Sequence, residues 1–138
     1  NAISEPAQIA YAFPELRCTF GNRSLVPDIA ILLWSSIPWD ETGEPEDDIK
    51  VAPDWIIEIL SPAQSPNRVA QKILYSLQQG TQLGWMLDPS DRSILVFVPN
   101  QLPMFYEGGE SLPILAPISA ELTCNQIFGW LQMNSTVN

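Results

Sequence analysis

The chain has 138 residues, of which 46% are apolar and 16% charged, which predicts one globular domain with its own core and excludes a disordered chain. Its 16 acidic and 6 basic residues give a net charge of −10, a field that repels phosphate backbones and disfavours DNA as a partner. The chain has no histidine, which excludes histidine catalysis. The absence of paired cysteine motifs argues against a structural zinc site.

The two cysteines, Cys18 and Cys124, lie far apart in the sequence. No secretory signal is visible, so we expect a cytoplasmic location and two buried free thiols rather than a disulfide. The longest wholly apolar run, IAILLW, is too short to span a bilayer, and no membrane partner is expected.

The first 24 residues show no clear hydrophobic period and indicate a loop with one or two short strands. LVPDIAILLW (25–34) predicts a strand buried on both faces, because its apolar character is continuous. The acidic segment 39–50 contains glycine and proline and is predicted to be a solvated loop. DWIIEILSP (54–62) predicts a second strand.

A helix is predicted over 65–80, because Ser65 is a good N-cap, Pro66 suits the first helical position and Gly80 suits the end. The apolar periodicity that follows predicts three more strands and a final helix, at 83–89, 93–99, 103–109 and 119–133. This order predicts an α/β fold, a mixed β-sheet flanked by helices.

Three polar residues stand in apolar settings: Asp28 at the start of one strand, Glu58 inside another and Lys72 at the border of the helix's apolar arc. A buried carboxylate is costly unless it is paired or binds a metal. Strand alternation gives Glu58 only the apolar neighbours Ile56 and Leu60 on its own face. A partner for Glu58 must therefore come from another element.

Asp54 is a poor partner for Glu58, because four residues along a strand separate their Cα atoms by about 13 Å. Asp28 lies on a separate strand and has no such limit. Lys72 lies on the helix that follows the Glu58 strand and can fold back over it. Two acids and a lysine that meet in this way would hold a hard divalent cation and a phosphate.

Each of these residues also has an ordinary structural explanation. Glu58 alone is compatible with a solvent-facing edge strand, Asp28 with a strand start and Lys72 with a surface lysine whose stem covers apolar surface.

Taken together and in order, VPDIAIL, APDWIIEILSP and RVAQKILYSLQQGTQLGWMLDP resemble the Uma-type putative restriction endonuclease family of the PD-(D/E)XK nuclease superfamily. The resemblance covers roughly residues 25–99. It implies a restriction-endonuclease-like fold and a Mg²⁺- or Mn²⁺-dependent endonuclease that hydrolyses phosphodiester bonds in DNA. Family members usually have a longer N-terminal part. We therefore expect residues 1–138 to form a single domain that lacks part of this region.

The resemblance makes Asp28 and Glu58 catalytic metal ligands, with the Ile59 main-chain carbonyl as a further ligand, and makes Lys72 the catalytic lysine. Leu60 occupies the strand position where the commoner superfamily motif has its lysine, so the charge must come from the helix.

Two further positions, Tyr75 and Trp85, match aromatic positions of the family and are interpreted as packing residues. The bases that could offset the acidic field locally are Arg17, Arg23, Arg68 and Lys72.

The alternative hypothesis is a catalytically inactive relative that acts as a binding or self-association module, for example a homodimer. Intact Asp28, Glu58 and Lys72 favour the nuclease, whereas the acidic charge favours the module. An unrelated activity on the same fold is the third possibility.

Overall fold

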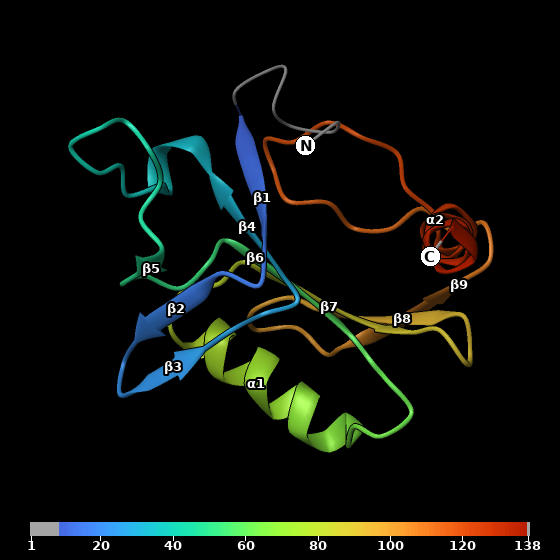
Figure 1. The fold of residues 1–138 in the computed structure, drawn as a ribbon. Helices are drawn as coiled ribbons and strands as arrows, with labels where there is room; N and C mark the ends of the chain where they lie inside the picture. The colour runs from blue at the N-terminus through green and yellow to red at the C-terminus, as the bar shows by residue number, and fades with distance from the viewer. Residues whose placement is uncertain (1–8, 138) are drawn as a thin grey trace.

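The computed structural model describes residues 9–137, with side chains as far as residue 133. Its centre is a six-stranded mixed sheet with the strand order β1-β4-β6-β7-β8-β9, in which only the pair β6–β7 is parallel (Figure 1). The strands are β1 (Ala10–Pro14), β4 (Ile29–Leu33), β6 (Trp55–Ile59), β7 (Leu83–Asp88), β8 (Ser93–Phe97) and β9 (Met104–Glu107).

A smaller three-stranded sheet has the order β3-β2-β5. Its strands are β2 (Arg17–Phe20), β3 (Arg23–Leu25) and β5 (Asp48–Ile49), and β2 pairs with β5 in parallel. Residues 9–25 therefore contain three strands, where one or two were predicted over the first 24 residues. The short 3-10 helix η2 (Trp34–Ser36) follows β4.

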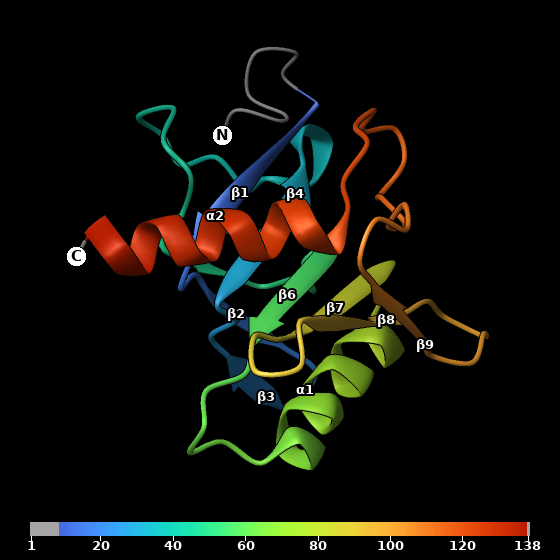
Figure 2. The same cartoon turned by 90° about the vertical axis from the view of Figure 1, so that its right-hand side faces the viewer.

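Two helices, α1 (Pro66–Gln78) and α2 (Cys124–Val137), cover opposite faces of the large sheet (Figures 1 and 2). The faces follow from strand alternation along β6. Ile56 packs in the cluster that contains Ile73 of α1, whereas Trp55 and Ile57 pack in the cluster that contains Phe128 of α2. The predicted α/β class, a mixed sheet flanked by helices, is confirmed.

The predicted start of α1 is confirmed. Ser65 caps the helix by accepting a hydrogen bond from the main-chain N–H of Arg68 at 3.4 Å, and Pro66 occupies the first turn. Gly80 follows the C-terminal cap with φ +119°, a conformation that favours glycine. Since the parallel neighbours β6 and β7 need a crossover, α1 returns over the face that carries Glu58.

Several predictions differ from the structure. The segment 39–50 was predicted to be a solvated loop, but it contains β5 with the buried Ile49. The strand predicted over 25–34 is shorter, because Val26–Asp28 leave the ladder before β4 begins at Ile29. The last helix was predicted from 119 but begins at Cys124, since Thr123 and Gln126 form a reciprocal capping box with bonds of 3.0 and 3.2 Å.

Cys18 and Cys124 are both buried and free, as predicted. Within residues 9–137, none of the helices has the length and apolar character that a bilayer crossing requires.

Candidate active site

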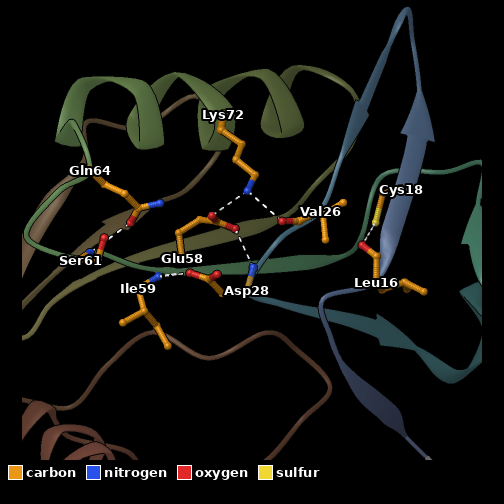
Figure 3. A network of polar contacts seen from close by, with 9 residues as sticks. All are labelled: Leu16, Cys18, Val26, Asp28, Glu58, Ile59, Ser61, Gln64 and Lys72. Carbon is orange, nitrogen blue, oxygen red and sulfur yellow. Dashed lines mark hydrogen bonds and ion pairs between the residues drawn. The ribbon is translucent and has the colours of Figure 1, made fainter.

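Asp28 and Glu58 are brought together by the register of β4 and β6. The last antiparallel pair at this end is Ile29 with Ile57, and Asp28 and Glu58 are the residues that adjoin this pair on the two segments. The main-chain N–H of Asp28 donates to the Oε2 atom of Glu58 at 3.1 Å (Figure 3).

Glu58 is the buried centre of the arrangement, with 2% of its surface exposed. Its side chain points towards α1, where the ammonium group of Lys72 donates to Oε1 at 2.8 Å (Figure 3). Burial raises the pKa of Glu58 above its ordinary value, and the Lys72 ammonium is the main opposing influence. The nearby Asp28 carboxylate adds a smaller like-charge contribution that raises the pKa further.

Lys72 joins three chain segments at this point. Its Nζ atom also donates to the main-chain carbonyl of Val26 at 3.0 Å, and about a quarter of the side chain, 24%, remains exposed. The lysine is thus held between the buried carboxylate and the segment before Asp28. No side-chain property of Val26 marks this contact, so sequence reasoning had no signal for it.

The Asp28 carboxylate accepts a hydrogen bond from the main-chain N–H of Ile59 at 2.7 Å. Asp54 does the same at the opposite end of the strand pair, where its carboxylate accepts from the N–H of Leu33 at 2.8 Å. The aspartate of each Pro-Asp pair therefore accepts a hydrogen bond from the end of the neighbouring strand. Only the Asp28 end also carries Glu58 and an ammonium group.

The donor set fits a hard divalent cation. Carboxylate and carbonyl oxygens are the ligands that Mg²⁺ takes, and Mg²⁺ commonly uses one or two carboxylates together with water and substrate phosphate. No cluster of three or more potential metal-binding side chains occurs among the described residues. At this end of the sheet, the side-chain ligands available to a cation are therefore the carboxylates of Asp28 and Glu58.

A shallow pocket of about 190 Å³ opens above Glu58. Arg68 and Lys72 bring two positive charges to its wall, and the remaining lining residues are Gln64, Ser65 and Val69. The other two bases considered from the sequence have contacts elsewhere: Arg23 lies 4.6 Å from the ring centre of Tyr75, and Arg17 pairs in register with Asp48.

Tyr75 and Trp85, which were interpreted as packing residues, both make packing contacts. Tyr75 stacks on Phe20 and donates its hydroxyl to the Phe20 carbonyl at 3.0 Å, and Trp85 is buried against Trp55. Leu60, at the strand position of the commoner lysine, joins the apolar cluster beneath α1.

Comparison with known proteins finds a family model and solved structures that match this chain. The model of the Uma2 family, described as "Putative restriction endonuclease", matches residues 1–126. A crystal structure from Anabaena variabilis, described as a putative nuclease belonging to DUF820, is 43% identical with a TM-score of 0.91, and the match covers 95% of this chain and 74% of that one. No curated protein matches. Both descriptions support a nuclease-like function.

Proposed function

We propose, from the premise that the chain belongs to the Uma2 putative restriction endonuclease family, that it is a Mg²⁺- or Mn²⁺-dependent endonuclease that hydrolyses phosphodiester bonds in DNA. The observation that carries this proposal is the meeting of Asp28, Glu58 and Lys72, from three separate segments, at one end of the sheet. A metal-dependent hydrolase of phosphodiesters needs oxygen ligands for its cation and benefits from a positive charge near the phosphoryl oxygens.

In this proposal the carboxylates of Asp28 and Glu58 and the main-chain carbonyl of Ile59 hold the cation. A bound divalent cation supplies Lewis-acid polarisation of the phosphoryl group and lowers the pKa of water. Lys72 stabilises the negative charge that develops on the phosphoryl oxygens. Its contact with Val26 keeps the ammonium group at the site while substrate enters.

In this proposal, main-chain N–H groups orient the two carboxylates. The N–H of Asp28 orients Glu58, and the N–H of Ile59 orients Asp28. Each carboxylate is thereby fixed by the chain segment that carries the other, which limits the reorganisation needed to bind the cation and the phosphate.

Plasmid nicking with Mg²⁺ or Mn²⁺ tests the proposal. Asp28→Asn, Glu58→Gln and Lys72→Ala each reduce the nicking rate by about 100-fold or more, the usual loss when one electrostatic group of a reaction centre is removed. Glu46→Gln and Lys50→Ala are matched controls, because both residues are exposed and outside the site. Circular dichroism confirms that each variant is folded. Equal rates for the wild type and all three site variants would refute the proposal.

A second candidate function, self-association, is favoured by one specific observation. The edge strand β9 exposes Met104 and Phe105 by 59% and 70%, next to Leu102 at 87%. An open strand edge pairs readily with another strand, and two copies of β9 can pair antiparallel about a two-fold axis. Sedimentation analysis of wild type and Phe105→Lys tests this. A monomeric wild type would exclude the homodimer, and loss of a dimer in the variant would support it.

A further inference from the structure

Next to the candidate site lies a second hollow, on the other face of the sheet. Its volume is about 340 Å³, within the usual size range of small-ligand sites, whereas the pocket above Glu58 is smaller. Ile59, Arg92 and Phe128 contribute to its lining, together with Pro89, Ser90, Leu131 and Gln132.

The two hollows lie on opposite faces of the sheet, and each is lined by one residue from the carboxyl end of β6. Glu58 lines one and Ile59 lines the other, and consecutive Cα atoms are about 3.8 Å apart. The turn between β7 and β8, which carries Arg92, lies beside the carboxyl end of β6 (Figure 2). A chain molecule that crosses this end of the sheet would pass from Lys72 over Asp28 and Ile59 towards Arg92.

Arg92 is suited to hold an anion at the second hollow. Its side chain is exposed, but its guanidinium lies 5.6 Å from the ring centre of Phe128 and donates to the Oε1 atom of Gln132 at 3.4 Å. These contacts hold the guanidinium at the wall of the hollow, which lowers the entropy lost on binding. Arg92 is also the only lysine or arginine in the sequence after Lys72.

We propose that this hollow is the subsite for a nucleotide next to the cleaved phosphodiester, with the guanidinium of Arg92 holding its phosphate. Guanidinium groups bind phosphate oxygens through two parallel hydrogen bonds, which a lysine cannot reproduce. The proposal rests on the proposed nuclease function for the identity of its ligand. Arg92 is a binding residue in this scheme and takes no part in the chemistry.

The test compares Arg92→Gln, Arg92→Lys and the matched control Arg17→Gln, all in the full chain. In plasmid and oligonucleotide cleavage, Arg92→Gln raises KM about tenfold, the loss expected for one charge-assisted hydrogen-bonding group, and leaves kcat within about twofold. Arg92→Lys restores part of the affinity, because it keeps the charge without the paired bonds. Arg17→Gln resembles the wild type.

A binding measurement separates this proposal from the proposed reaction. The same substitutions are placed in the Glu58→Gln background, and a short labelled single-stranded DNA is titrated by fluorescence anisotropy over a series of salt concentrations. Arg92→Gln weakens binding about tenfold and reduces the slope of log affinity against log salt by about 0.7, the value for one lost phosphate contact. A purely structural role for Arg92 would leave this slope unchanged.

Binding that depends on Arg92, in a protein that cleaves no DNA, would support the subsite and refute the reaction. If Arg92→Gln changes neither the cleavage kinetics nor the DNA affinity, the subsite is refuted, whereas the proposed reaction is not. If the wild type binds no oligonucleotide under any salt condition, the subsite is refuted as well.

Discussion

Asp54 and Asp28 perform the same structural task at opposite ends of one strand pair. Each follows a proline and directly precedes a strand, and each carboxylate accepts the N–H near the end of the neighbouring strand, Leu33 for Asp54 and Ile59 for Asp28. The repetition of Pro-Asp in the sequence thus reflects the antiparallel pairing of β4 and β6. What distinguishes Asp28 is its proximity to Glu58 and Lys72.

Removing the Asp54 carboxylate is expected to affect stability without affecting the reaction. Asp54→Ala leaves the N–H of Leu33 without its partner in a largely buried position, which costs about 1.5 to 3 kcal/mol of unfolding free energy. Urea denaturation measures the loss, and the nicking rate per folded molecule stays at the wild-type value. A large fall in that rate would place Asp54 in the reaction centre and contradict the proposed site.

The ion pair between Lys72 and Glu58 gives a second stability prediction. Lys72→Met leaves a buried carboxylate without its cation and destabilises the protein by about 1 to 3 kcal/mol, with the partial exposure of Lys72 limiting the loss. The double variant Glu58→Gln/Lys72→Met regains part of this free energy, because no buried charge remains. A double-mutant cycle in urea measures the coupling. Additive effects would show that the pair contributes nothing.

Gly84 allows α1 to approach the sheet closely. A Cβ atom added there would lie 2.5 Å from Cγ2 of Ile73 and 3.4 Å from Cγ2 of Ile56. Gly84→Ala therefore overpacks the contact and lowers the unfolding free energy by about 1 to 3 kcal/mol. Gly109→Ala is the control, since nothing lies within 4 Å of a Cβ atom at that residue. Equal stabilities of the two variants would contradict the close packing of α1.

The Cys18 thiol is expected to be unreactive in the native protein. Burial raises its pKa to about 12, with a smaller contribution from the Asp48 carboxylate, so almost no thiolate forms at mildly alkaline pH. Native Cys124→Ser protein, in which Cys18 is the single thiol, should resist a disulfide-exchange reagent and react fully in urea. Rapid labelling without denaturant would show that the thiol is accessible.

The lowered pKa of Asp48, in β5, predicts a pH dependence of stability. The Thr19 hydroxyl, which donates to Asp48 at 2.9 Å, is the main cause that lowers the Asp48 pKa below its ordinary value of 3.8. A carboxyl group whose pKa is lowered in the folded state stabilises the protein at pH values above the pKa of the unfolded state. This stabilisation is lost as the pH falls through the folded-state pKa. Thermal unfolding of wild type and Thr19→Val should therefore differ near neutral pH and converge as the pH falls below 3.8. A constant difference would exclude the hydrogen bond as the cause.

Much of the fold and of the candidate site could be predicted from local patterns. The cap at Ser65, the glycine at the end of α1 and the alternation along β6 are local features, and the structure contains all three. Strand geometry also removed Asp54 as a partner of Glu58, because that limit depends only on the rise per residue. Where helix α2 begins was missed, since the capping box of Thr123 and Gln126 lies inside the predicted helix.

The sequence by itself determined which side chains were available for a site: Asp28, Glu58 and Lys72, with no histidine and no paired cysteines. Only the tertiary structure decided how they meet. The β4–β6 pairing ends at Ile29 and Ile57 and so brings the adjoining residues Asp28 and Glu58 into contact, and the crossover through α1 places Lys72 over Glu58. Contacts made by the backbone, such as those of Val26 and Ile59, were invisible in the sequence, because every residue carries the same carbonyl and nearly every one the same N–H.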